Sequence, residues 1–591
     1  MQCLGWRGVT HPAFRAAPCA VPAAGWRGYS PRSPPSHEDV GITEFFSPEL
    51  PGFPARLRER KRDFQVHELT PDGTQLRLRG PLWLKRDAAA LPQPPETLSG
   101  SEMAAPWPQG CPEHLHFTLY QEGLGTSEAL AVLARCVRRP AWHFRVAGVK
   151  DRRAISAQRA SIFRLRRSSL RRAVLHPDWD NRVRFCDVEY RPAALRIGDL
   201  AGNRFDLVLR GAPAGLAAPG GAEELREAVE ALESRGFLNY FGLQRFGSQQ
   251  TPSQLVGSAL LANDWQRALE LILGEAMELL PVAAGAAGRP GGRAPTATIR
   301  AICRLPQRHF IEREILCGIA DGLGPEGAVR RLPWNVLFMY VNAAQSLVFN
   351  RVLSRRVQRF GREPVAEDFG VGSAVSGGDV ACGGVFGLAA GPRALGAPGA
   401  AALAGARPAP LARVVLPLPG RAMEYPKHLV DEYSEASETL LGLPLDAFHR
   451  FEGWTRVEGA YRAIAVAPRE LALRAVSAEE VARAGRALLR SDVDLVYDEL
   501  QKSGSASKEE ASKLLGGAET AAAEEPAVVL GCTLPPAAYV TMAVRELTRG
   551  QAAAEDSHAA AGHFGIASLG GEAGSMESLQ ESLALAGKQK K

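Results

Sequence analysis

The sequence predicts a mixed α+β protein, because segments with the period of a strand occur along the chain together with segments with the period of a helix. Residues 63–69 (DFQVHEL) and 203–209 (NRFDLVL) alternate in the manner of β-strands. Helical spacing of apolar residues occurs in 127–136, 222–235, 335–357, 478–490 and 537–547. The chain has 591 residues, of which 46% are hydrophobic and 23% charged. This length predicts about three to four domain-sized units with a sizeable core.

Tracts rich in Ala, Gly and Pro divide the predicted elements. They lie near residues 86–110, 282–297, 372–412 and 502–527, and again beyond 551. Such sequence buries too little apolar area to offset its ordering entropy, so we expect these tracts to be linkers or surface insertions. The blocks between them are 38–85, 111–281, 298–371, 413–501 and 528–550.

The first 37 residues contain four arginines and no acidic side chain. This bias is typical of an organelle transit peptide, whereas the six prolines of the same stretch favour a disordered leader. Localisation therefore stays open between nucleus or cytoplasm and, for a cleaved leader, mitochondrion or plastid. No run of 18 or more apolar residues occurs, so we expect no membrane-spanning helix and no membrane partner.

Positive charge is concentrated in one stretch of the chain. Between Arg145 and Arg184 there are twelve Lys or Arg residues and three Asp residues, whereas the whole chain has a net charge of only +6. A surface that contacts phosphates is the functional interpretation, and a solvated face of a sheet is the alternative.

A first candidate site lies within this stretch, in the segment AGVKDRRAISAQ (147–158). It stands between extended stretches at 142–146 and 159–165, so we expect Asp151 in a tight loop at a strand end. Loop carboxylates often only form turns. The neighbours Lys150, Arg152 and Arg153 instead favour an ionised carboxylate beside a substrate, and such a group is a usable nucleophile.

A second candidate is the segment GFLNYFGLQRFG (236–247). Its twelve residues contain four aromatic rings, two amides, one arginine and three glycines. Extruded nucleobases are held by aromatic stacking and amide hydrogen bonds, so the mixture suits a base pocket. An aromatic core with a bend shaped by glycine is the alternative.

A third set of polar residues lies on the predicted helix near 334–357. Asn342, Gln345 and Ser346 interrupt an apolar surface at helical spacing and therefore share one face. Buried amides are usually structural hydrogen-bonding groups, so we expect these residues to support a domain junction.

Together, GVKDRRAISAQ (148–158) and NYFGLQRFG (239–247) resemble motifs of the TruD family of pseudouridine synthases, in this order and spacing. Further stretches are similar to the same family, and DVGITEF looks like its eukaryotic branch. They are DVGITEF (39–45), DFQVHEL (63–69), GDLAGNRF (198–205), YVNAAQSLVFNRVLSRR (340–356), PLPGRAMEYP (417–426), GAYRAIAV (459–466) and LPPAAYVTMAVREL (534–547). The resemblance covers about 39–550.

The resemblance implies a pseudouridine-synthase catalytic domain, with a mixed sheet and helices, that carries an inserted α/β TRUD domain. The implied division is a leader or transit peptide (1–37), the first part of the catalytic domain (38–237), the inserted TRUD domain with low-complexity loops (238–468), the second part of the catalytic domain (469–550) and a disordered tail (551–591). The last predicted helix would then belong with the first half of the chain.

The family converts a uridine within RNA to pseudouridine by breaking the N-glycosidic bond, turning the uracil and rejoining it through carbon. Asp151 matches the catalytic aspartate, Phe241 the aromatic residue that packs against the base and Asn239 the amide beside it. Attack at C1′ and routes through a glycal or a base adduct all remain open. A residue inside an RNA fold must be unstacked before it can react, and a ring that receives the base offsets part of that cost.

This sequence departs from the family at a position that faces the catalytic aspartate. Where the family commonly has a lysine before the Asp-Phe pair, Arg58 aligns here, and Lys61 is the nearest lysine. Arginine keeps the charge but has a different hydrogen-bonding geometry. Ser156 in place of threonine and Val540 in place of alanine are mild changes.

We therefore expect a monomeric pseudouridine synthase that acts on tRNA, with mRNA or other structured RNA as further candidates. Asp151 would be the nucleophile, and Asn239, Phe241 and Arg58 would hold the substrate. Lys150, Arg152, Arg153 and Arg245 would contact RNA. An intramolecular rearrangement needs no metal or cofactor, and none is expected. A non-catalytic RNA-binding protein that keeps the fold is the alternative, and a methyltransferase or hydrolase lacks a cofactor loop or metal motif in this sequence.

Overall fold

The computed structural model describes residues 35–79, 107, 110, 112–247, 252–279, 310–370, 393–394, 410–450, 457–484, 488–502 and 525–554. Most of the predicted leader, tail and low-complexity tracts lie outside these residues. Strands and helices are both abundant in the described part of the chain, so the predicted α+β class is confirmed.

The largest sheet in the described part of the chain has ten strands, seven of them in the order β14-β15-β7-β2-β5-β3-β6. Its strands are β1 (Ala55–Leu57), β2 (Phe64–Leu69), β3 (His114–Glu122), β4 (Phe144–Val146), β5 (Ile155–Phe163), β6 (Val183–Arg191), β7 (Gly202–Arg210), β14 (Arg469–Val476), β15 (Ala527–Leu534) and β16 (Ala552–Ala554). The pairs β2–β5 and β1–β16 are parallel, and the other pairs are antiparallel. The sheet therefore joins strands from both ends of the chain.

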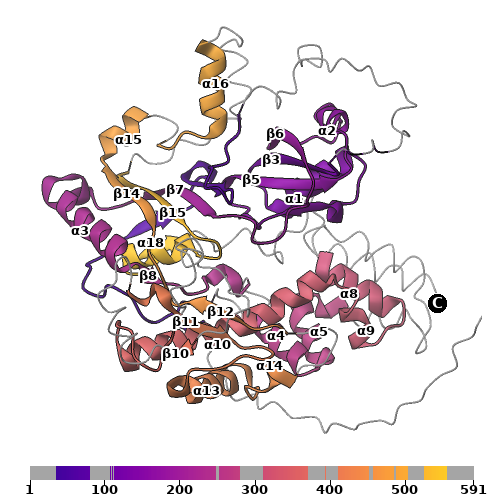
Figure 1. Cartoon of the computed structure of the whole chain (residues 1–591), viewed down its shortest axis with the longest axis vertical. Helices are drawn as coiled ribbons and strands as arrows, with labels where there is room; N and C mark the ends of the chain where they lie inside the picture. Colours follow the sequence, from indigo (N-terminus) through magenta and orange to yellow (C-terminus); the bar gives the residue numbers. More distant parts are fainter. Residues whose placement is uncertain are drawn as a thin grey trace, which may run out of the picture.

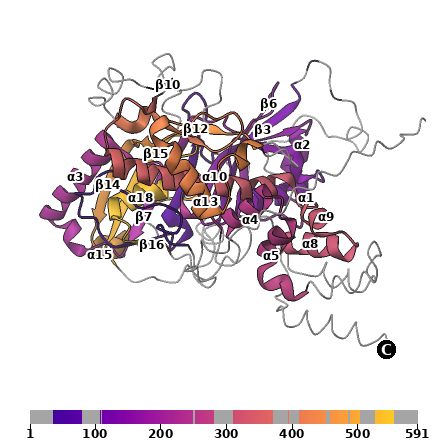
Figure 2. The same ribbon diagram turned by 90° about the horizontal axis from the view of Figure 1, so that it is seen from below.

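The two strands predicted from alternation are β2 and β7, and they pair with each other. Five of the six residues of β2 are buried, and β2 lies between β7 and β5 in the interior of the sheet. Helices that pack with this sheet or extend from its strands are α1 (Thr126–Cys136), α2 (Arg167–Ala173), α3 (Pro219–Arg235), α15 (Ala478–Ala484), α16 (Asp492–Lys502) and α18 (Val540–Thr548). Figure 2 shows α3, β14 and α15 at one end of the molecule.

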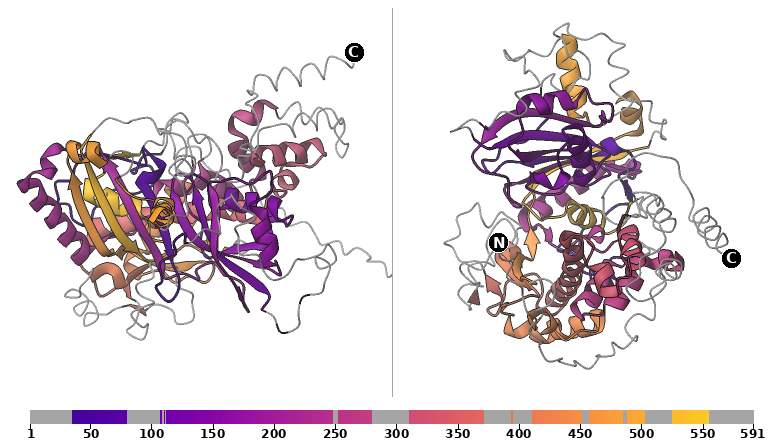
Figure 3. Two further views of the ribbon diagram at one scale, coloured as in Figure 1. Left: turned by 90° about the horizontal axis from the view of Figure 1, so that it is seen from above. Right: turned by 90° about the vertical axis from the view of Figure 1, so that its right-hand side faces the viewer.

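A helical half lies below the large sheet in Figure 1, and the right-hand view of Figure 3 shows the same two halves. Its helices are α4 (Ser253–Leu261), α5 (Trp265–Leu273), α8 (Phe310–Ala320), α9 (Pro325–Val329), α10 (Trp334–Phe360), α13 (Val430–Leu441) and α14 (Ala447–Arg450). Two small sheets accompany them: β10-β9-β11-β12, with β9 (Phe369–Gly370), β10 (Arg393–Ala394), β11 (Val414–Leu418) and β12 (Ala460–Ala463), and the pair β13-β8, with β8 (Phe237–Leu238) and β13 (Ala465–Val466). The exact boundaries of the inserted domain remain a prediction.

Helix α10 forms the core of the helical half, where the sequence predicted a helix over 335–357. Its part from Val336 to Phe360 is long and apolar enough to cross a membrane by length and composition, but 78% of the most apolar window is buried inside the protein. Gln345 Nε2 donates to the carbonyls of Pro419 and Glu458, at 2.6 and 3.2 Å. Gln345 thus has the structural role that the sequence suggested.

Two predicted helices differ from the structure at their ends. α18 begins at Val540 and not at 537, because Ala537 has a positive φ of 61° that a helix does not allow. The described part of α15 runs to Ala484, and residues 488–490 are not helical. The next helix starts shortly afterwards, where the Ser491 hydroxyl and Asp494 carboxylate share a hydrogen bond of 2.8 Å.

The end of α3 fixes the entry to the second candidate site. Gly236 has a φ of +79°, and a Cβ at this position would lie 2.3 Å from the Val466 carbonyl oxygen. Only glycine therefore fits here without moving backbone. The chain then forms β8, which pairs with β13. The backbone N–H of Asn239 donates to the Ile464 carbonyl at 2.9 Å.

Candidate active site

The loop 147–154 presents Asp151 between β4 and β5, as the sequence predicted. Backbone hydrogen bonds hold both ends of the loop, from Gly198 N to Ala147 O and from Gly123 N to Ala154 O, each 2.9 Å long. A loop tied at both ends keeps its side chains in place, which a reacting group requires.

The Asp151 carboxylate pairs with Arg58, which arrives from the turn before β2. Arg58 Nη2 donates to Asp151 Oδ2 at 2.5 Å. The arginine side chain is only 11% exposed, whereas that of the aspartate is 40% exposed. The site thus combines a fixed cation with a carboxylate that a molecule from solution can reach.

Arg58 is itself held on several sides. Its backbone has a φ of +63°, which is uncommon for a residue with a side chain. Its guanidinium carbon lies 4.3 Å from the centre of the Phe64 ring, and its carbonyl accepts a hydrogen bond of 3.2 Å from Arg153 Nη2. The predicted cation beside Asp151 is therefore fixed by ring stacking and by its backbone.

Lys150 does not lie where the sequence suggested. Its ammonium group is buried and donates to Glu68 Oε2 and Asn203 Oδ1, both at 2.8 Å. If Lys150 left this pair, the buried Glu68 carboxylate would remain without its counter-charge, which costs free energy. Lys150 thus anchors the Asp151 loop to β2 and β7, and its predicted contact with RNA stays a prediction.

The other predicted RNA-contacting arginines differ in exposure. The Arg152 side chain is 50% exposed and lies 3.5 Å from the Glu128 carboxylate. Arg153 is half-buried beneath Arg58. Arg245 is half-buried, donates to Ser346 Oγ at 3.4 Å and lies over the Phe241 ring. Of the three, Arg152 is the most accessible to a phosphate.

The second candidate site is an aromatic core. Asn239 is fully buried, and Phe241 is 4% exposed. The Phe241 ring meets Phe349 of α10 and Tyr539 edge to face, with centroids 5.4 and 6.0 Å apart. This burial agrees with the alternative of an aromatic core, and the role of Phe241 in receiving a base stays a prediction.

Asn239 already has partners for both atoms of its amide. Nδ2 donates to the Ala463 carbonyl at 2.9 Å, and Oδ1 accepts from Arg462 Nη2 at 2.7 Å. A base could bond this amide only by displacing one of these partners or by using its second N–H. The structure therefore shows that two protein groups hold the Asn239 amide, and its predicted role in holding the substrate stays a prediction.

Arg462 is the residue of this core that the sequence analysis missed. Its side chain is fully buried on β12, and its guanidinium carbon lies 4.1 Å from the centre of the Phe241 ring. Nε and Nη1 donate to the carbonyls of Asn239 and Ala537, at 3.0 and 2.9 Å. Burial, with a smaller contribution from repulsion by Arg245, lowers the pKa of Arg462 to about 10. The signal in the sequence was an arginine inside the apolar stretch 460–466.

The predicted site residues thus form two groups, one around Asp151 and Arg58 and one around Phe241 and Asn239. Among the described residues, no hydrogen bond, ion pair or ring contact joins the first group directly to the second. Asn350 of α10 fixes the second group: its Oδ1 accepts from Phe241 N, and its Nδ2 donates to Phe241 O, both at 2.9 Å.

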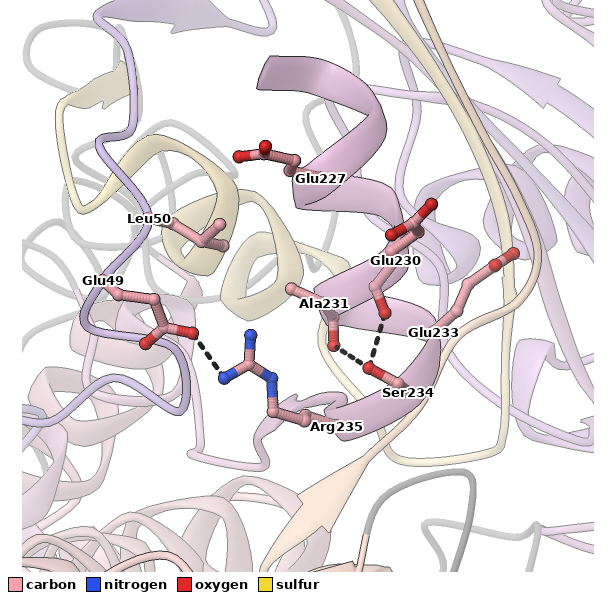
Figure 4. A pocket seen from close by; sticks show the side chains of 8 residues that line it. All are labelled: Glu49, Leu50, Glu227, Glu230, Ala231, Glu233, Ser234 and Arg235. Carbon is pink, nitrogen blue, oxygen red and sulfur yellow. Dashed lines mark hydrogen bonds and ion pairs between the residues drawn. The ribbon is translucent and has the colours of Figure 1, made fainter. Parts of the chain in front are cut away.

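A surface hollow lies elsewhere, between α3 and the segment at Glu49 (Figure 4). Its lining residues are Glu49, Leu50, Glu227, Glu230, Ala231, Glu233, Ser234 and Arg235. Four of them are glutamates, so the hollow would repel a phosphate backbone. It contains none of the predicted site residues. Across the described ranges, no group of three or more His, Cys, Asp or Glu side chains is placed to hold a metal ion.

Comparison with known proteins adds to this geometry. The family model described as tRNA pseudouridine synthase D (TruD) matches residues 39–483. The chain is 33% identical over 344 residues to "Probable tRNA pseudouridine synthase D" of Halobacterium salinarum, covering 56% of this chain and 68% of that protein.

Eukaryotic relatives are similar over a longer stretch. The chain is 28% identical over 458 residues to "Pseudouridylate synthase 7 homolog" of Homo sapiens and 30% identical over 468 residues to "Multisubstrate pseudouridine synthase 7" of Schizosaccharomyces pombe. Both alignments cover 75% of this chain, and they cover 60% and 63% of those proteins. The chain therefore spans less than two thirds of the length of these relatives. A crystal structure of the putative tRNA pseudouridine synthase D from Methanosarcina mazei aligns with 87% of this chain and 97% of its own, at 20% identity and a TM-score of 0.46.

Proposed function

Because this chain belongs to the TruD family of pseudouridine synthases, we propose that it isomerises specific uridines in RNA to pseudouridine, with tRNA as the first substrate. The names of its relatives support both parts of this proposal: one is a probable tRNA pseudouridine synthase and another a multisubstrate pseudouridine synthase. Messenger RNA and other structured RNAs are further candidate substrates.

The observation that carries the proposal is the accessible Asp151 carboxylate beside the mostly enclosed Arg58 guanidinium. In the reaction, the bond between N1 of uracil and C1′ breaks, and a bond between C5 and C1′ forms. The proton on C5 leaves to solvent and N1 gains a proton, so the product is an isomer of the substrate. Asp151 would act as the nucleophile on the nucleotide, and Arg58 would hold it in position.

Phe241 and its neighbours would shape the wall against which the detached uracil turns. Phe241 is nearly buried, so we propose that a bound nucleotide moves it or meets only its edge. Arg462 and Asn239 would keep the loop of Phe241 in place. Arg152 would contact phosphates near the loop of Asp151.

The test uses tRNA transcripts labelled with tritium at C5 of uridine, since each turnover releases that proton to water. We expect wild-type protein to release tritium and Asp151→Asn to be slower by about 10³-fold or more, with RNA affinity close to wild type. Asp178→Asn, an exposed aspartate in the same basic stretch, is the matched control and should keep activity. Equal tritium release by wild type and Asp151→Asn would exclude Asp151 as the nucleophile. RNA binding without release by either would favour the non-catalytic alternative.

A further inference from the structure

Three large apolar side chains remain mostly exposed on the segments that flank β4 and the loop of Asp151. Trp142 is 72% exposed, Val149 is 74% exposed and Ile197 is 79% exposed. Because these side chains stay in contact with water in the folded chain, they contribute little to its stability. Val149 is only two positions before Asp151 in the sequence.

The segment 195–198 runs beside β4 and the loop of Asp151. Leu195 N donates to Ser161 Oγ at 3.1 Å, and Ser161 pairs with Arg145 of β4. Gly198 N donates to Ala147 O at 2.9 Å. These two contacts place Ile197 next to the start of the loop that carries Val149 and Asp151. Trp142 stands at the other end of β4.

Arginines accompany the apolar side chains. Arg145, Arg152 and Arg196 are exposed. Within the described residues, no carboxylate pairs with the side chain of Arg145 or Arg196. Asp199, the nearby acid, accepts a hydrogen bond of 2.7 Å from the backbone N–H of Arg196. The surface is therefore both cationic and apolar, and it continues into the proposed site.

We infer that this surface, which we call the β4 edge surface (Trp142, Arg145, Val149, Arg152, Arg196 and Ile197), binds the RNA nucleotides that flank the target uridine. The inference rests on the proposed function. Arginines contact phosphates, whereas exposed apolar and aromatic side chains cover the faces of unstacked bases and riboses. When one uridine flips out of a stack, the faces of the two flanking bases lose a stacking partner, and side chains of this kind can replace it.

The spacing of the side chains favours RNA over a protein partner. Apolar and cationic residues alternate along the β4 edge surface, at 142, 145, 149 and 152 on one segment and at 196 and 197 on the other. The core of a protein interface is depleted of charge. A nucleic acid presents phosphates and bases in turn, which matches an alternating surface.

The experiment measures binding of a fluorescent unmodified tRNA transcript to the full chain carrying Asp151→Asn, at several salt concentrations. With Arg145→Ala and Arg196→Ala combined, we expect the slope of log Kd against log salt to fall by about 1.4–1.8, as two phosphate contacts are lost. With Trp142→Ala or Ile197→Ser, we expect Kd to rise about fivefold to tenfold at an unchanged slope. In the otherwise wild-type enzyme, Ile197→Ser should act on KM more than on kcat.

Controls use equally exposed residues elsewhere. Trp334 at the start of α10 is 70% exposed, and Arg469 is exposed on the edge strand β14. Trp334→Ala and Arg469→Ala should leave Kd and its salt slope unchanged. The inference is overturned if the β4 edge variants bind tRNA like these controls. If the wild-type protein releases tritium and the β4 edge variants bind tRNA as the wild type does, the inference about this surface is wrong and the proposed function stands. Wild-type protein that binds tRNA through this surface but releases no tritium would contradict the proposed function alone.

Discussion

The Asp151 side chain is accessible although it is paired, as is that of Glu189 on β6 beside Arg159. Asp63 and Arg210, for comparison, form an ion pair in which each side chain is only 4% exposed. In the pair of Asp151 and Arg58, the arginine side chain is 11% exposed and the aspartate side chain 40% exposed. A pair buried on one side holds its geometry and still lets a substrate reach the carboxylate, which is the arrangement that a nucleophile needs.

Arg462 should contribute strongly to stability. Its buried guanidinium is held by three neutral oxygens and an aromatic ring, and not by a carboxylate. We predict that Arg462→Ala lowers the free energy of unfolding by about 3 kcal/mol or more, since the Asn239 and Ala537 oxygens lose their donors and a cavity forms. Arg462→Lys restores charge but not the fork of N–H groups, so its loss should be intermediate. Urea unfolding measures both, and a loss below about 0.5 kcal/mol for Arg462→Ala would contradict this account.

At the scale of residues, the sequence located Asp151, Arg58 and Phe241 through motif order and resemblance. It could not tell that Lys150 turns inward, because its partners Glu68 and Asn203 come from strands far away in the chain. The supporting role of Asn239 depends in the same way on Arg462, more than two hundred residues later. Local pattern identifies candidate residues, and long-range packing decides which atoms stay available.

At the scale of elements, the segment 37–47 fastens α10 and α18 to each other. Asn350 of α10 donates to Val40 O at 3.2 Å as well as to Phe241 O. Glu546 of α18 accepts hydrogen bonds from the backbone of Phe46 and Ser47, at 3.1 and 2.6 Å. The stretch DVGITEF thus lies against the helix that positions Phe241.

The packing of the segment 37–47 should become less stable in mild acid, because His37 is then protonated in the unfolded chain. Burial, followed by repulsion from Arg545, lowers the pKa of His37 from 6.5 to about 4. Between these two values the unfolded chain binds a proton that the folded chain does not, so stability present above about pH 6.5 is lost as the pH falls. The full loss would be up to about 3 kcal/mol. We predict that His37→Gln removes this part of the pH dependence, as measured by urea unfolding between pH 7 and pH 4.5. Identical pH profiles for both proteins would contradict it.

Helices and strands were predicted well where apolar periodicity was continuous, as for β2, β7, α1 and α10. The errors occurred at ends. Ala537 has a positive φ that no pattern of apolar residues reveals, so α18 starts later than predicted. The role of the segment 37–47 was also not predicted, because its contacts join parts of the chain separated by about three hundred and five hundred residues.

At the scale of the whole molecule, the large sheet depends on strands from both ends of the chain. β15 pairs with β7 over eight positions and with β14 on its other side. Val528, Leu530 and Cys532 of β15 are completely buried. The discontinuous arrangement followed from the family resemblance, whereas the order of strands could not be read from periodicity, since pairing across hundreds of residues leaves no local signal.

A chain that ends at residue 524 should therefore not fold. It would lose β15, α18 and β16, expose the pairing edges of β7 and β14, and leave much of the core open to water. We expect it to be insoluble or to lack a cooperative unfolding transition in circular dichroism. A chain that ends at residue 554 is the control and should unfold cooperatively. Cooperative unfolding of the shorter chain would show that the sheet does not need its C-terminal strands.

The central claim is that the Asp151 carboxylate meets a uridine that has left its stack. The most direct measurement is a crystal structure of Asp151→Asn protein bound to an RNA whose uridine the wild-type protein isomerises. We expect the C1′ atom of that uridine within about 3–3.5 Å of the side chain at position 151, and Arg58 beside it. A target uridine that stays stacked in the RNA, with the position 151 side chain directed away from every ribose, would contradict the claim.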